Sequence, residues 1–165
     1  MTNPLSINIL IVTGAIIAAT TLCADPAQAQ RGRGDPPVQV GCTVYAEDMS
    51  FGSIVRGSGD VRTTAAITLA CEPGVDFEVA IDRGLHSLGT NRRMMNSRGT
   101  GYMRYNIYRD PAFSAAWRDR GQGTLSGSSG TGQPRTLIAY GEIRQNDVSD
   151  VAGTYQDTVT IAFHF

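Results

Sequence analysis

The chain of 165 residues contains no lysine, so all fourteen of its basic residues are arginines. Fifteen acidic residues oppose them, and the formal net charge at pH 7 is −1. A near-neutral chain lacks the electrostatic footprint that binding to nucleic acid or to an anionic membrane requires. We therefore expect no nucleic-acid partner, and membrane contact only through an export signal.

The sequence also lacks the motifs of common catalytic sites. Histidine occurs only at His86 and His164, and His164 is expected on the solvent face of a strand. No nucleophile elbow, zinc-binding His-Glu-x-x-His, P-loop or dinucleotide-binding glycine motif is present. Most aspartates outside the N-terminal region adjoin Gly, Pro or Asn, where Asp commonly stabilises turns. We expect no enzymatic activity, no cofactor and no metal.

The N-terminal apolar run has no Lys or Arg before it. Residues 5–22 are mostly apolar and lead into Ala27-Gln28-Ala29, a small-x-small site for signal peptidase. This pattern predicts a signal peptide over residues 1–29, which Cys23 and Asp25 leave with. The alternative is an uncleaved membrane anchor, because the apolar run is nearly long enough to span a bilayer.

Only two of the three cysteines remain after such cleavage, Cys42 and Cys71. An even pair behind an export signal predicts a disulfide in an oxidising compartment. The alternative is a metal site or a redox thiol. It is not favoured, because the spacing is not Cys-x-x-Cys and no histidine lies near either cysteine.

Helical periodicity is scarce, and short alternating apolar runs lie between glycine-rich turns. This pattern predicts an all-β sandwich with no internal repeat. Residues 87–101 and the glycine- and serine-rich residues 121–133 are expected to be long connections, the second one flexible. The expected strands cover residues 38–45, 65–71, 77–82, 102–108, 136–143 and 155–165.

The last of these strands ends the sequence. Val159, Ile161, Phe163 and Phe165 alternate with smaller or polar residues, which predicts a strand with one strongly apolar face. No following strand is available to pair with it. Such an edge aggregates unless something covers it, so we expect a covering partner.

Three further patterns have a functional and a structural interpretation. Residues 146–150 could supply oxygen ligands to calcium, but they lack the spacing of a calcium loop and indicate a polar turn. The tripeptide Arg33-Gly34-Asp35 resembles an adhesion motif, but a Gly- and Arg-rich tail produces it easily by chance. Four aromatic residues could form a carbohydrate platform, and packing in the core or at its rim is favoured. They are Tyr102, Tyr105, Tyr108 and Trp117.

The order of motifs resembles the spore coat protein U domain family, which includes Csu-type pilins of archaic chaperone–usher pili. The resemblance covers nearly all of residues 41–165 and rests on seven segments. They are Gly41-Cys42-Thr43-Val44, Phe51-Gly52, Cys71, residues 77–82, residues 102–110 with Trp117 after them, residues 140–143, and residues 153–159.

This resemblance implies an incomplete immunoglobulin-like β-sandwich that lacks its final strand and carries one disulfide, Cys42–Cys71. Residues 38–165 would form this domain. The missing strand would leave a hydrophobic groove beside the last strand, filled first by a periplasmic chaperone. At an outer-membrane usher, the N-terminal segment of the next pilus subunit would replace the chaperone. Four residues would border this acceptor groove: Val159, Ile161, Phe163 and Phe165.

The donor segment departs from the family pattern. Residues 30–37 form a polar tail rich in Gly and Pro, and only Val38 and Val40 alternate as a donor strand requires. Pro36 and Pro37 each remove a ladder N–H. Residues 38–40 are therefore expected to be at most a weak donor, in a minor or terminal subunit, or part of the first strand.

The sequence thus predicts an exported structural subunit of a surface fibre, assembled by the chaperone–usher route and supporting adhesion or biofilm formation. It would pass through the periplasm to the cell surface. The alternative is a self-contained secreted envelope or coat protein of the same fold that binds a surface ligand.

Overall fold

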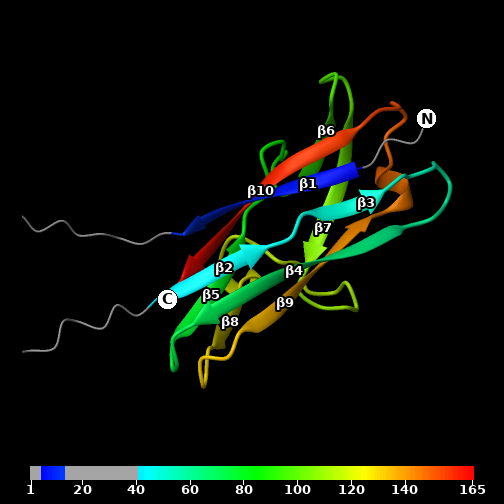
Figure 1. Cartoon of the computed structure of the whole chain (residues 1–165). Helices are drawn as coiled ribbons and strands as arrows, with labels where there is room; N and C mark the ends of the chain where they lie inside the picture. Colours follow the sequence, from blue (N-terminus) through cyan, green and yellow to red (C-terminus); the bar gives the residue numbers. More distant parts are fainter. Residues whose placement is uncertain (1–4, 14–40) are drawn as a thin grey trace, which may run out of the picture.

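The computed structural model describes residues 5–13 and 41–165 (Figure 1). The expected tail over residues 30–37, the valines Val38 and Val40, and the expected cleavage site at Ala29 lie outside the described residues. No helix among the described residues is long and apolar enough to cross a membrane. The described part consists of ten strands, joined by loops and two single-turn 3-10 helices.

The elements follow one another in chain order, with bounds that alternate short and long strands. They are β1 Leu5–Thr13, β2 Cys42–Ala46, β3 Met49–Gly52, β4 Val61–Cys71, β5 Asp76–Ile81, β6 Arg92–Asn96, β7 Tyr102–Tyr108, η1 Gly121–Gly123, β8 Leu125–Ser128, β9 Arg135–Ile143, η2 Gln145–Asp147 and β10 Tyr155–His164.

The strands form two layers of an immunoglobulin-like sandwich, as predicted. One layer has the order β2-β4-β9-β7, and all its pairs are antiparallel. The other contains β3, β1, β10 and β6, with β5 and β8 attached to β10. The strand β7 joins the layers, because its first half pairs with β6 and its last residues pair with β9.

The core lies between the layers and is built by the predicted alternation. On β7, Met103, Tyr105 and Ile107 are buried, whereas Tyr102 and Arg104 are exposed. Trp117 lies outside the strands and is fully buried, and its Nε1 donates to the carbonyl of Val79 at 2.9 Å. Buried tyrosine and tryptophan usually need such a polar partner.

Six of the strands were expected, with small shifts at their ends. The strand β4 begins four residues earlier than the expected residue 65, and β2 begins at Cys42 instead of residue 38. The strand β10 ends at His164 instead of Phe165. Strand ends depend on the length of the partner strand, and β4 is extended because β9 pairs along it from Val61 to Leu69.

Two expected connections contain strands, and those expectations were wrong. Within residues 87–101 lies β6, in which Arg92, Met94 and Asn96 form the buried face. An apolar pattern cannot reveal this strand, because two of its three inward residues are polar.

Within residues 121–133 lies β8, which pairs with β5. Its Gly127 lies against the Phe77 ring, where a Cβ atom would be 2.7 Å from Cζ. This part of the expected flexible loop is therefore ordered by pairing and packing. The short strand β3, with Met49 and Phe51 buried, was also not predicted.

Candidate strand-accepting groove

The predicted groove residues lie on β10. Val159, Ile161 and Phe163 are buried in the core between the layers. Phe165 lies beyond the end of the strand and is 50% exposed, near Phe77 of β5. The inward face of β10 is therefore formed by Val159, Ile161 and Phe163, together with Tyr155 and Asp157 at its start.

One edge of β10 is closed by two neighbouring strands. The strand β6 pairs with its first two residues, and β5 pairs with its last four, Ile161 to His164. Neither reaches the middle, residues 157–160. Without another partner, backbone groups there would be left without hydrogen bonds.

A strap formed by residues 82–86 closes the middle of the same edge. The Asp82 amide donates to the Thr160 carbonyl at 3.0 Å, and the Leu85 amide donates to the Thr158 carbonyl at 2.9 Å. In return, the Thr160 amide donates to Asp82 Oδ1 at 2.9 Å. This edge of β10 is therefore closed along its length.

Asp157 holds the strap against β10. The Tyr105 hydroxyl donates to Asp157 Oδ2 at 2.7 Å, and the His86 amide donates to Oδ1 at 3.1 Å. The His86 Nδ1 atom also lies 2.9 Å from Oδ1. Gly84 in the strap has φ +81°, and a Cβ there would lie 2.0 Å from Asp157 Oδ2, so only glycine fits.

The electrostatics of this cluster keep Tyr105 protonated. Burial raises the pKa of Tyr105 well above its usual value, and the nearby Asp157 carboxylate raises it further. A neutral hydroxyl is the form that can donate to Asp157. Sequence reasoning did not single out Asp157 or the strap, since their roles depend on contacts distant in sequence.

The other edge of β10 pairs with β1 (Figure 1). The two strands are parallel and in register from Ser6 and Gln156 to Thr13 and Phe163. The positions in register with Val159 and Ile161 are Ile9 and Ile11. The segment that the sequence assigns to an export signal thus occupies the predicted place of the missing strand.

The opposite side of β1 pairs with β3, which runs antiparallel to it. The edges of β3 and β10 therefore face each other across the width of one strand. The floor includes Met49 and Phe51 of β3, which pack over Gly141 of β9. A Cβ at Gly141 would lie 2.3 Å from Met49 Sδ, so glycine leaves room for this packing. We call the space between β3 and β10 the acceptor groove.

The acceptor groove supports one kind of chemistry, the addition of a strand. Two facing edges supply main-chain donors and acceptors, and the buried apolar residues of β10 and β3 supply a floor. Such a site gains affinity from backbone hydrogen bonds and specificity from alternate side chains.

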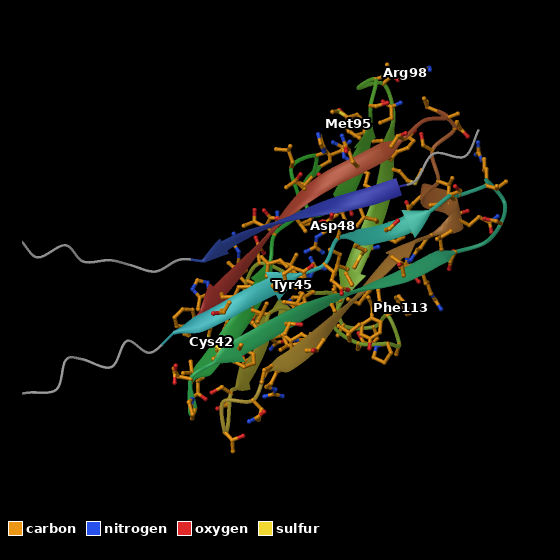
Figure 2. The ribbon with its side chains drawn as sticks, viewed as in Figure 1. Cys42, Tyr45, Asp48, Met95, Arg98 and Phe113 are labelled. Carbon is orange, nitrogen blue, oxygen red and sulfur yellow. A yellow bond between two sulfur atoms is a disulfide. The ribbon has the colours of Figure 1, made fainter. Side chains whose placement is uncertain are left out.

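The predicted disulfide is present and lies at one end of the sandwich. Cys42 and Cys71 are bonded, and they face each other in the pairing of β2 with β4. Figure 2 shows Cys42 at the beginning of β2, far from the β6–β7 turn at Arg98.

Of the four aromatic residues considered for a carbohydrate platform, three are core residues. Tyr105, Tyr108 and Trp117 are buried, which confirms the packing interpretation for them. Tyr102 is 43% exposed, and the Arg93 guanidinium lies 4.2 Å from its ring centre.

The loop over residues 146–150 is held by arginines. Asp147 lies 3.9 Å from Arg104 Nη1, and Asp150 pairs with Arg56. Within residues 41–165, no group of three or more His, Cys, Asp or Glu side chains is arranged to hold a metal ion. His164 is exposed at the end of β10.

Residues 34–162 match the family described as the Spore Coat Protein U domain. The match covers most of the chain, so the chain belongs to this family. No curated protein matches it significantly.

Among solved structures, the chain is similar to a chain of the CsuC–CsuE chaperone–tip adhesion subunit pre-assembly complex. That complex comes from the archaic chaperone-usher Csu pili of Acinetobacter baumannii. The TM-score is 0.57 and the sequence identity is 21%. The alignment covers 76% of this chain and 40% of the other, so this chain spans less than half the length of the protein it matches. The similarity shows a shared fold.

Proposed function

We propose that this protein is a structural subunit of a surface fibre assembled by the chaperone–usher route. Its biological role is adhesion or biofilm formation, and no catalytic step is part of it. The observation that carries the proposal is the acceptor groove, whose two edges require one added strand. The family match and the fold shared with a chain of a chaperone–subunit complex support it.

In this proposal residues 1–29 are an export signal that is removed in the periplasm. Removal takes β1 away and leaves β10 and β3 without the strand between them. A periplasmic chaperone then supplies that strand, and the next pilus subunit replaces it at an outer-membrane usher. Because each donor inserts into a neighbouring subunit, the contact is heterologous and builds an open filament at the cell surface.

The groove contacts fall on the inward side of β10. Val159, Ile161 and Phe163 contact the inserted strand, and Phe165 contacts it at the open end. Val38 and Val40 are the donor residues of this chain. Two valines contribute about 1.5–3 kcal/mol each when fully buried, which fills little of a groove at least eight residues long. This composition fits a minor or terminal subunit.

Chaperone capture tests the proposal directly. The gene is co-expressed with a tagged periplasmic chaperone of the archaic chaperone–usher class, and the co-purified subunit is quantified. Phe163→Asp places a charge in the apolar floor and should abolish capture, because an unpaired buried charge costs several kcal/mol. His164→Asp is the matched control, since His164 is the next residue and is exposed.

Capture of the His164→Asp variant at the wild-type level, with loss of the Phe163→Asp variant, is the expected result. Equal capture of all three proteins contradicts the groove assignment.

A second candidate is a self-contained envelope β-sandwich that keeps its N-terminal segment. It is favoured by one observation: β1, from the same chain, already fills the acceptor groove. The N-terminal mass of the exported protein separates the two candidates. A chain that begins near residue 30 and needs a chaperone supports the fibre subunit. An uncleaved, cooperatively unfolding monomer supports the self-contained protein.

A further inference from the structure

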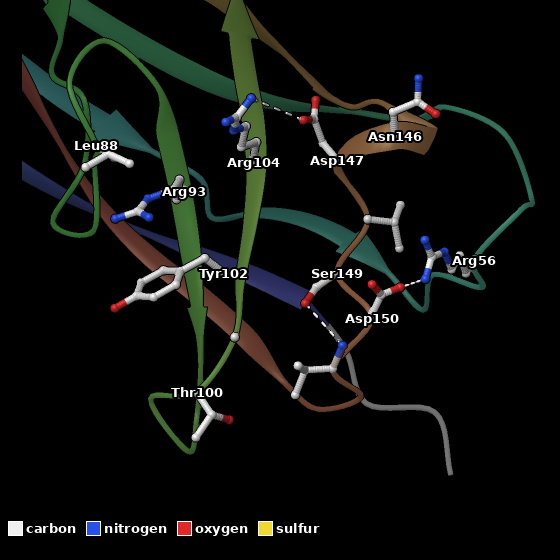
Figure 3. A pocket seen from close by; sticks show the side chains of 13 residues that line it. Arg56, Leu88, Arg93, Thr100, Tyr102, Arg104, Asn146, Asp147, Ser149 and Asp150 are labelled. Atoms are coloured by element: carbon white, nitrogen blue, oxygen red, sulfur yellow. Dashed lines mark hydrogen bonds and ion pairs between the residues drawn. The ribbon is translucent and has the colours of Figure 1, made fainter.

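Two adjoining hollows lie along β7 and the loop before β10. The Tyr102 hollow has a volume of about 600 Å³ and is lined by Arg56, Arg93, Tyr102 and Arg104, among others (Figure 3). The Arg118 hollow has a volume of about 310 Å³. Its arginines are Arg92, Arg104, Arg118 and Arg144. The two hollows share Arg104 and Asp147.

The lining is strongly cationic, although the whole chain is near neutral. Six of the fourteen arginines line the two hollows, against two aspartates, Asp147 and Asp150. Both aspartates pair with arginines of the lining, and Arg144 pairs with Glu142. Within the part of the chain described, no carboxylate forms an ion pair with the other three arginines. They are Arg92, Arg93 and Arg118.

One of these cations is rigidly held at the wall of the Arg118 hollow. The Arg92 side chain is buried, and its guanidinium donates to the carbonyls of Ile81 and Trp117 at 2.9 and 2.7 Å. Its Nε donates to the Asp82 carbonyl at 2.8 Å. Carbonyl groups satisfy its donors without neutralising its charge, so a nearby anion is attracted to it.

The remaining lining groups suit a ligand rich in hydroxyl groups. Amide and hydroxyl side chains contribute donors and acceptors to both hollows, and the half-exposed Tyr102 ring offers an apolar surface. These polar residues are Thr100, Asn146 and Ser149 in the Tyr102 hollow, and Asn91 and Asn106 in the Arg118 hollow.

We propose that the two hollows form a binding site for an acidic polysaccharide, whose carboxylate or sulfate groups contact Arg93, Arg104 and Arg118. Asp147 lies between the hollows and repels a ligand with a charge at every unit, such as a nucleic acid. A polysaccharide can place a neutral part of a sugar there. The site is separate from the acceptor groove, because β6 and β10 lie between β7 and β1.

Binding to defined polymers tests this proposal. The full-length gene product is exported, purified in the complex it forms and immobilised for interferometry. The probes are hyaluronan as the carboxylate polymer, dextran sulfate as the sulfate polymer, neutral dextran and single-stranded DNA. We expect at least one acidic polysaccharide to bind and neutral dextran not to bind, and the tighter arm identifies the acidic group.

Arg104→Gln and Arg118→Gln should each weaken that binding about tenfold or more, since each removes a charged hydrogen-bond donor from the site. Both side chains are exposed, so neither change should unfold the protein or alter chaperone capture. Arg98→Gln is the matched control, because Arg98 is exposed at the β6–β7 turn outside both hollows (Figure 2).

Three results would overturn the proposal. The first is no binding to either acidic polysaccharide. The second is an equal loss in the Arg98, Arg104 and Arg118 variants, which would reflect net charge alone. The third is binding of single-stranded DNA as tight as that of the polysaccharides.

Discussion

At the scale of single residues, the buried polar side chains bind the loops to the strands. Asp157 accepts hydrogen bonds from Tyr105 and from the strap at His86, and Arg92 donates to three carbonyls on neighbouring segments. Glu142 accepts from Arg62 and Arg144 and from the Tyr108 hydroxyl. Among the described residues, no buried side-chain nitrogen or oxygen lacks a partner. Removing one partner is therefore more costly than the bond itself is worth.

The raised pKa of Tyr105 leads to a prediction about alkaline stability. The native hydroxyl stays protonated while the unfolded tyrosine ionises near pH 10, so the stability from this group is complete below pH 10 and is lost as the pH rises above it. At pH 11 the loss from this group alone is about 1.4 kcal/mol. Urea unfolding of the wild-type protein at pH 9 and pH 11 measures it.

The variants in this experiment separate Tyr105 from the other tyrosines. Tyr105→Phe should be less stable at pH 9, by about 1–3 kcal/mol, because Asp157 loses a donor. It should also lose less stability between pH 9 and pH 11 than the wild type. The exposed Tyr102→Phe should keep the wild-type pH dependence. A Tyr105→Phe variant with the wild-type dependence would show that another group titrates.

At the scale of elements, the two layers exchange strands at two places. Residues 42–52 cross between layers, since β2 pairs with β4 whereas β3 pairs with β1. β7 makes the same crossing between β6 and β9. Among the described strands, the ladder of β2 is formed with β4 alone, and the disulfide ties the start of β2 to the end of β4.

This position makes the disulfide important for stability. Replacing both cysteines, Cys42→Ser with Cys71→Ser, should lower the free energy of unfolding by about 3–4 kcal/mol, because the bond closes a loop of about 30 residues. The comparison uses the chaperone-bound or fibre-bound protein, with thermal unfolding as the measurement. An unchanged midpoint would mean that the β2–β4 ladder holds this end without the bond.

At the scale of the whole molecule, the acceptor groove decides whether the sandwich is complete. With β1 in place, β10 pairs along both edges, and the apolar residues of its inner face are buried. Without that strand, backbone groups of β3 and β10 lose their partners and the apolar floor faces water. An open apolar edge of this length is an aggregation hazard.

A peptide of residues 5–13 should complete a chain that lacks them. A protein of residues 30–165 alone is expected to aggregate, and addition of the peptide during refolding should restore a soluble, cooperatively unfolding complex. The matched peptide carries Ile9→Asp and Ile11→Asp at the positions in register with Val159 and Ile161, and it should fail. A soluble, cooperative protein of residues 30–165 without any peptide would contradict the incomplete fold.

The sequence by itself determined the features that depend on local alternation and on cysteine pairing. The apolar faces of β5, β7 and β10 could be read directly, because every second residue there is apolar and faces the core. The disulfide followed from an even pair of cysteines, and the family resemblance predicted the incomplete sandwich that the structure shows.

Only the tertiary structure decided the features that depend on contacts between distant segments. The polar faces of β6, the pairing of β8 with a hidden partner and the strap over β10 leave no apolar period in the sequence. The clustering of six arginines around two hollows is equally invisible, because these residues come from three separate stretches of the chain. Local patterns report which residues avoid water, whereas buried polar groups and charged surfaces are defined by the partners that folding brings to them.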